Sequence, residues 1–176
     1  MNLFFDIVTL LFALILQLVC GDIFAFPVPF SVCALLALAM RRKLIPAVIT
    51  ALAAGFILDF ACGREFASCA LAMPLAVAVA GVLLPVDPIR FTFADYILPG
   101  AAAGGILGVV QLVTPLFFGE EWFYLARNSA VLVTSLLPGV ILLPLTILTV
   151  DRLAKSLEVD RIFKRTIAVA LRSARR

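Results

Sequence analysis

Long apolar stretches separated by short polar breaks run through this chain of 176 residues. Stretches without a charged residue cover 7–21, 23–40, 44–58, 66–86, 96–119 and 128–150. An α-helix rises about 1.5 Å per residue and needs about 20 residues to cross the hydrocarbon core of a bilayer. The last three stretches reach that length, and the first and third reach it when extended to roughly 3–21 and 44–62. The pattern therefore predicts six membrane-spanning helices.

The second stretch is the weakest of the six. Pro27 and Pro29 interrupt its start, and proline is poorly tolerated inside a helix. We expect its regular part to run from about Phe26 to Met40, which is short for an unaided crossing. Such a segment thins the bilayer, packs among longer neighbours or re-enters the membrane from one side. The sequence leaves these three alternatives open.

Composition supports a membrane protein. Apolar residues make up 64% of the chain and the mean hydropathy is +1.19, whereas charged residues make up only 14%, against about 25% in soluble domains. The absence of histidine excludes triads that need an imidazole base and most metal sites. We therefore expect an all-α membrane protein, a six-transmembrane-helix bundle, with no enzymatic activity and no cofactor or metal.

Lysine and arginine indicate the orientation, because cytoplasmic loops are enriched in them. With six spans and both termini inside, all of these residues except Arg64 and Arg127 lie on the cytoplasmic side. The predicted domains are a transmembrane bundle over 1–150 and a basic cytoplasmic tail over 151–176. We therefore expect a multi-pass membrane protein with both termini in the cytoplasm.

The tail carries eight basic and three acidic residues, a net charge of +5. Two interpretations stay open: a basic amphipathic helix on the anionic inner leaflet of the lipid bilayer, or a retention signal for topology. Nucleic acid is not an expected partner. The residues predicted to meet the membrane surface, which cluster on one side of a helical projection, are Arg161, Arg165, Arg172 and Arg176.

The third span holds the most informative pattern. Ala47, Ala51, Gly55 and Asp59 are each four residues apart and therefore share one helix face. Small residues in such a row let another helix approach closely, and an acidic group inside a membrane helix usually has a partner. Asp59 is either a docking carboxylate at a helix–helix contact or an interfacial residue satisfied by water or by the turn at 63–64.

A second small-residue row, Ala72, Ala76 and Ala80, follows along the fourth span, and Gly104 and Gly108 lie four apart in the fifth. Such rows either hold one bundle together or receive a helix from another protein. We expect them to form a groove for a foreign helix. The predicted partner-binding residues are Ala47, Ala51, Gly55, Asp59, Gly63, Ala72, Ala76 and Ala80.

Two smaller features complete the pattern. Gln17 lies inside the first span and is expected to form an interhelical hydrogen bond. The four cysteines are expected to be small buried hydrophobic residues. A disulfide between Cys62 and Cys69 is the alternative for that pair.

The segment over 41–63 resembles the rod shape-determining protein MreD family. That family has a short basic turn, here Arg41-Arg42-Lys43, and then a span ending in Gly-Leu-Leu-x-Asp with a glycine four residues later. Gly55, Asp59 and Gly63 match these positions. The family often has a further glycine four residues on, where this chain has Ala67. Chain length, the early prolines, six predicted spans and the basic end also match.

The resemblance implies a non-enzymatic component of the bacterial elongation machinery, located in the bacterial cytoplasmic (inner) membrane as a multi-pass protein. Proteins of this kind bind the single-span scaffold protein MreC, and through it influence RodA with its partner transpeptidase and the filament protein MreB. The family is similar in fold to the substrate-binding S-components of energy-coupling factor vitamin transporters, which supply the alternative function. An S-component is expected to carry Ala-x-x-x-Ala in its first span, but Ala13 is followed four residues later by Gln17. The assembly function is therefore favoured.

Overall fold

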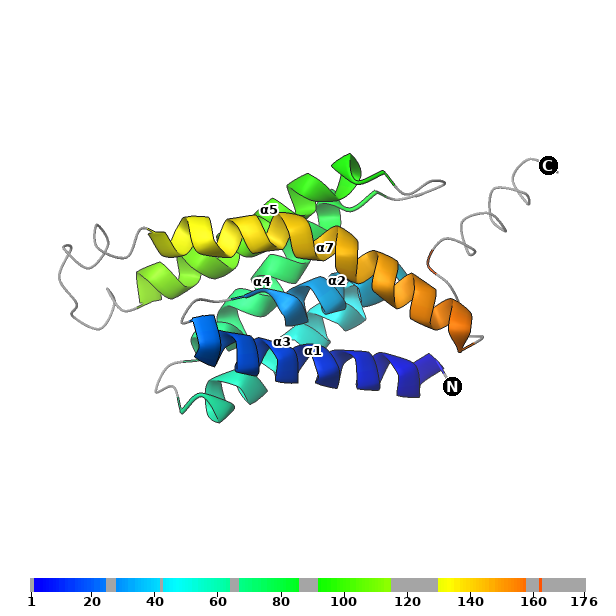
Figure 1. Ribbon diagram of the computed structural model, residues 1–176. Helices are drawn as coiled ribbons and strands as arrows, with labels where there is room; N and C mark the ends of the chain where they lie inside the picture. The colour runs from blue at the N-terminus through cyan, green and yellow to red at the C-terminus, as the bar shows by residue number, and fades with distance from the viewer. Residues whose placement is uncertain are drawn as a thin grey trace.

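The protein is a bundle of α-helices. The computed structural model describes residues 2–24, 28–41, 43–63, 67–85, 92–114, 130–157 and 162. No β-strand occurs within these ranges, so the predicted all-α fold is confirmed. Figure 1 shows the helices packed side by side. They are α1 (Asn2–Phe24), α2 (Phe30–Arg41), α3 (Leu44–Ala61), α4 (Ser68–Leu83), α5 (Ala94–Val113) and α7 (Ala130–Ser156).

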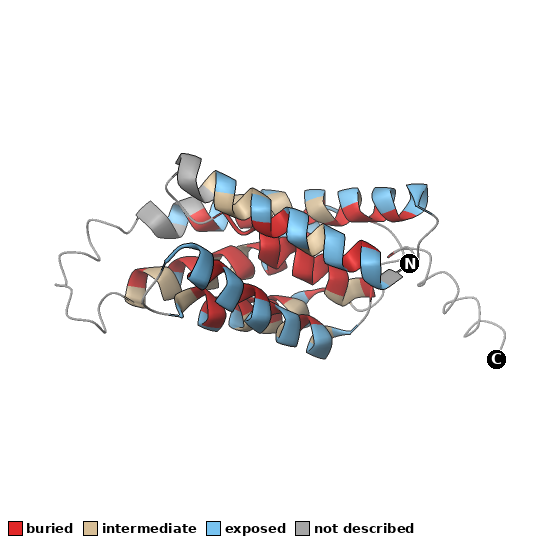
Figure 2. Cartoon of the chain, turned by 90° about the horizontal axis from the view of Figure 1, so that it is seen from below, coloured by how far each residue is buried: buried red, intermediate tan, exposed pale blue. Residues whose placement is uncertain are grey.

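Four of the described helices, α1, α3, α5 and α7, are long and apolar enough to cross a membrane. Their large apolar side chains cover the outside of the bundle, and Figure 2 shows the buried residues on the inward faces of the helices. A soluble protein of this size would bury such side chains, whereas a membrane protein exposes them to lipid. The chain is therefore a multi-pass membrane protein.

The short helix α2 lies inside the bundle, in contact with α1, α3, α4 and α7. Its side chains from Ser31 to Leu38 are buried. At 12 residues it is about 18 Å long, well below the thickness of the hydrocarbon core. Packing among longer neighbours, one of the three alternatives for this segment, is seen in the structure.

Several helix boundaries differ from the sequence-based expectation. α2 begins at Phe30 rather than at about Phe26, and α4 covers Ser68–Leu83 rather than the whole apolar stretch over 66–86. α7 continues past residue 150 to Ser156, so the predicted domain boundary falls inside a helix. Asp151, at that boundary, is buried and accepts a hydrogen bond.

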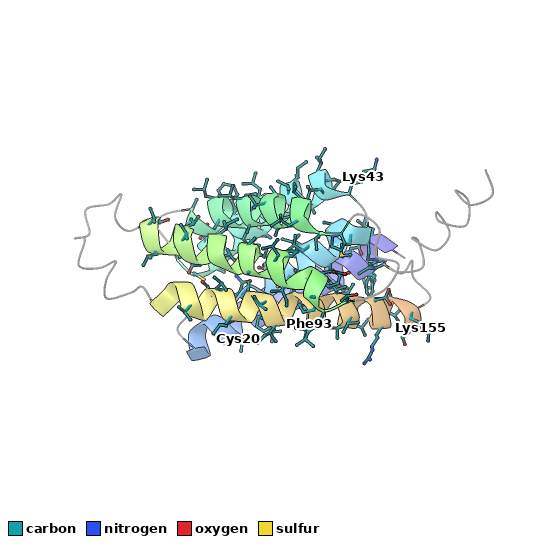
Figure 3. The ribbon with its side chains drawn as sticks, turned by 90° about the horizontal axis from the view of Figure 1, so that it is seen from above. Cys20, Lys43, Phe93 and Lys155 are labelled. Atoms are coloured by element: carbon teal, nitrogen blue, oxygen red, sulfur yellow. The ribbon has the colours of Figure 1, made fainter. Side chains whose placement is uncertain are left out.

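The beginning of α1 and the end of α7 lie at the same end of the bundle (Figure 1). Lys43 and Lys155 also lie toward this end, and Cys20 lies toward the opposite end (Figure 3). The lysines and arginines of the described residues sit at the ends of α2 and α7 and just before α3. All of the described basic residues are therefore gathered at one end, which we call the basic end.

Helices α5 and α7 form the most extensive helix–helix contact among the described elements. A Cβ atom at Gly100 would collide with the carbonyl oxygen of Gly139, and one at Gly139 would collide with that of Gly100. A Cβ atom at Gly104 would similarly collide with the carbonyl oxygen of Ser135. The two backbones touch because these positions carry no side chain. The predicted glycine surface of the fifth span thus serves packing within the chain.

Candidate functional site

The small-residue rows of α3 and α4 lie inside the bundle. Ala51, Ala72, Ala76 and Ala80 have no exposed surface, and Ala47 is 7% exposed. The expected groove for a foreign helix is therefore not open in this structure, because the chain's own helices occupy it. The spacing of the small residues correctly predicted a surface on which helices pack closely. The helices that pack on it belong to the same chain.

Gly55 marks the closest approach of α3 and α4. A Cβ atom at this position would lie 2.5 Å from both the Cα of Ala70 and the carbonyl oxygen of Cys69. These distances are far shorter than van der Waals contact, so no other residue fits without moving a backbone. Gly55 thus lets the first turn of α4 pack directly on α3.

Asp59 binds that same first turn. Its carboxylate is only 4% exposed and accepts the backbone N–H of Cys69 at 3.0 Å and of Ala70 at 2.8 Å. The Ser68 hydroxyl donates to it at 3.5 Å. The first backbone N–H groups of a helix have no partner inside the helix, and Ala67, which precedes α4, has no side-chain acceptor. Asp59 therefore caps α4, and its negative charge meets the positive end of the helix dipole.

Asp59 lies at a helix–helix contact, as one of the two interpretations expected, but that contact is within its own chain. Its two oxygens accept N–H groups of its own chain, so the carboxylate is not presented to a foreign helix. These N–H groups belong to the start of α4. A sequence pattern shows where side chains of a kind recur, but it does not show which backbone N–H groups need an acceptor. The cap was missed for that reason.

Gly63 completes the connection. It follows Cys62, the residue that caps the C-terminal end of α3, and has a φ of +60°, in the left-handed region that favours glycine. Its N–H donates to the carbonyl oxygen of Phe60 at 3.1 Å, which closes the helix end in the manner common for a glycine at this position. The three residues that match the family positions therefore all belong to one hairpin. Gly63 ends α3, Gly55 leaves room for α4 to pack closely, and Asp59 caps the start of α4.

A similar contact joins α1 to α2. The Gln17 side-chain oxygen accepts the backbone N–H of Ser31 at 3.0 Å and a short hydrogen bond from the Ser31 hydroxyl. Ser31 is in the first turn of α2 and fully buried. The predicted interhelical hydrogen bond of Gln17 is therefore confirmed, and the start of the second short helix is also held by the long helix that precedes it.

An ion pair that the sequence analysis missed joins the basic ends of α1 and α2. The Arg41 guanidinium donates to the Asp6 carboxylate at 2.6 Å, with both side chains buried. The guanidinium carbon also lies 4.8 Å from the centre of the Phe5 ring, a cation–π distance. The sequence did contain an indication of this pair, because Asp6 and Arg41 fall on the same predicted side of the membrane, at the ends of successive spans.

No group of three or more histidine, cysteine, aspartate or glutamate residues that could hold a metal occurs in the described part of the chain. The four cysteines are free thiols, so the alternative Cys62–Cys69 disulfide is not formed. Cys33 and Cys69 are buried as expected, whereas Cys62 is exposed. The tail arginines predicted to meet the membrane surface lie outside the described residues: Arg161, Arg165, Arg172 and Arg176.

The contacts of Gln17, Asp59 and the Asp6–Arg41 pair have the same effect: each holds a short helix against the longer helix before it. Together they can fix the positions of α2 and α4, and so the outer surface of the bundle. No family model matches the chain, and neither a curated protein nor a solved structure similar to it was found.

Proposed function

We propose that this protein is a non-enzymatic membrane component of the bacterial elongation machinery, of the MreD type, that docks the scaffold protein MreC. Its role is to support lateral peptidoglycan synthesis and cell shape. The observation that carries the proposal is the concerted placement of Gly55, Asp59 and Gly63 in one hairpin. The three matched residues all shape the same hairpin, which supports treating them as a motif rather than as chance matches in an apolar sequence.

The proposed partners are MreC and, through it, RodA with its transpeptidase and MreB. The proposed location is the cytoplasmic membrane, with both termini in the cytoplasm. The gathering of the described lysines and arginines at the basic end supports this orientation, because positive charge is retained on the cytoplasmic side. The placement of the beginning of α1 and the end of α7 at that end agrees with an even number of crossings.

Because the small residues of α3 and α4 are buried inside the bundle, a partner protein can bind only at other positions. A helix of MreC inside the membrane can reach only outward-facing side chains, such as Ile49 and Phe56 on α3, which are 65% and 55% exposed. Ala51 and Ala76 lie behind them with no exposed surface. The buried residues of the motif therefore act indirectly in this proposal: they set the shape of the hairpin that carries the contact surface.

The alternative function, a vitamin-transporter S-component, gains no support from α1. Ala13 and Gln17, the residues at the positions considered for a coupling contact, face the bundle: Ala13 is 8% exposed and Gln17 is bonded to Ser31. A coupling subunit would have to use another part of α1. We therefore keep one proposed function.

Purification of the tagged full-length protein from its native membrane in mild detergent tests this proposal. We expect MreC to be enriched over an untagged control. A photo-crosslinking residue scanned over the outward positions of the bundle should capture MreC, and the enclosed position of Ala51 is the matched negative control. Absence of MreC, or enrichment of a transporter ATPase in its place, would contradict the proposal.

A further inference from the structure

The outward face of α7 changes from apolar to basic near the basic end. Ile141 and Leu145 are 52% and 50% exposed on this face. Arg152 is also exposed, and it follows Leu145 by seven residues, about two helical turns, so it lies on the same face. Between them, the Thr149 hydroxyl donates to the carbonyl oxygen of Leu145 in its own helix. The face that meets lipid therefore continues directly from apolar side chains to a cation.

The last two turns of α7 present two cations beside an apolar side chain. Lys155 is exposed and follows Arg152 by three residues, and side chains at this spacing are neighbours on a helix. Leu153, beside them, is 50% exposed. The acid of these turns, Asp151, is buried and accepts the backbone N–H of Ile162, so its carboxylate is directed into the bundle. The outward surface of the last two turns is therefore positively charged.

The length of α7 places these cations at the surface of the membrane. The helix has 27 residues and is about 40 Å long, about 10 Å longer than the hydrocarbon core is thick. Charged side chains are costly inside the hydrocarbon, so the end of α7 that bears Arg152 and Lys155 lies among the lipid headgroups. Ile141 and Leu145 then lie beside the acyl chains of the same leaflet.

We infer that Arg152 and Lys155 bind the headgroup of an anionic phospholipid whose acyl chains lie along Ile141 and Leu145. A guanidinium group pairs with two oxygens of one phosphate, and the neighbouring ammonium group adds a second positive charge. A zwitterionic lipid offers the same phosphate but carries a cation of its own, which these two side chains repel. Charge complementarity therefore selects the anionic lipid. This inference goes beyond the proposed function and does not depend on MreC.

Labelling with a photoactivatable phosphatidylglycerol tests this inference. The reactive group is in an acyl chain, the full-length protein is in mild detergent, and mass spectrometry locates the labelled residues. We expect labelling of α7 near Leu145. Unlabelled phosphatidylglycerol should suppress this labelling at about one-tenth of the concentration that phosphatidylcholine requires, or less, because two cations face the headgroup. Equal competition by the two lipids would overturn the inference.

Charge variants separate a defined site from general attraction between the protein and anionic lipid. Arg152→Gln should lower the labelling of α7 about fivefold, and addition of Lys155→Gln should lower it about tenfold or more in total. Both side chains are exposed, so the unfolding temperature should not change.

Lys43→Gln is the matched control, because it removes one charge from an exposed residue at the same end of the bundle. Figure 3 shows Lys43 and Lys155 on opposite sides of the bundle. This variant should leave the labelling of α7 within about twofold of the wild-type level. The inference is overturned if the variant that lacks both Arg152 and Lys155 is labelled like the wild type, or if Lys43→Gln lowers the labelling as much as Arg152→Gln does. The second outcome would mean that only the net charge of the protein attracts the lipid.

Discussion

The carboxylate of Asp59 accepts the backbone N–H of Ala70 at 2.8 Å, so the last turn of α3 holds the first turn of α4. Four residues before the acid, Gly55 gives α4 room to reach it. A hydrogen bond from a backbone N–H to a buried charge in an apolar environment is strong because little water competes for it. The hydrogen bond and the close approach together hold α3 and α4 as one hairpin. Asp59 and Gly55 each lead to a separate prediction.

Removing the carboxylate should destabilise the bundle. Asp59→Leu leaves the N–H groups of Cys69 and Ala70 buried without their acceptor, at a cost of about 1–3 kcal/mol for each. Asp59→Asn keeps one acceptor oxygen and should lose less. Thermal unfolding in detergent measures both. Asp95→Leu, at an exposed acid in the first turn of α5, is the control and should cost less than about 1 kcal/mol, because it removes only an exposed charge near the helix dipole. Equal unfolding temperatures for wild type and Asp59→Leu would show that the cap contributes nothing.

Adding a methyl group at Gly55 should separate the two helices. Gly55→Ala places a carbon 2.5 Å from backbone atoms of α4, and overpacking of this kind costs about 1–3 kcal/mol. Gly105→Ala is the matched control, because nothing lies within 4 Å of a Cβ atom at that position, and replacing a helical glycine by alanine stabilises by up to about 1 kcal/mol. Opposite signs of the two changes in unfolding temperature are expected. A stabilising Gly55→Ala substitution would refute the close approach.

The buried Asp6–Arg41 pair should show strong coupling. Asp6→Leu or Arg41→Met alone leaves a charge buried without its ionic partner, which typically costs about 3–5 kcal/mol. The double variant removes both charges and should recover most of that loss. A double-mutant cycle based on unfolding in detergent measures the coupling. Lys43→Met, at an exposed charge nearby in the chain, serves as the control. Additive losses in the double variant would mean that the two side chains do not stabilise each other.

The sequence predicted the elements of the fold better than their contacts. Apolar length alone placed the third span at roughly 44–62, close to the observed Leu44–Ala61, because a membrane-crossing helix must be long and apolar. It overestimated α4, whose helix begins only at Ser68, where the Asp59 cap acts. It also ended the last span at 150, since a charge in the sequence looks solvated until its partner is known.

The candidate site was only partly predictable. The four-residue spacing of Ala51, Gly55 and Asp59 correctly indicated one buried face, but the same spacing suits a helix of the same chain and a helix of another protein equally well. The ion pair between Asp6 and Arg41 depends on which helices are neighbours, and that is decided by packing across the whole bundle. Backbone donor groups, such as the N–H groups whose hydrogen bonds Asp59 accepts, are not visible in side-chain patterns.

The proposed function is support of cell-wall elongation, and depletion of the protein in the cells that produce it tests that proposal most directly. The measurement is the length-to-width ratio of the cells together with labelling of new peptidoglycan along the lateral wall. Our account predicts rounded cells with lost lateral labelling, restored by the wild-type gene and by Gly105→Ala but poorly by Asp59→Leu. Depleted cells that keep their shape and their lateral labelling would contradict it.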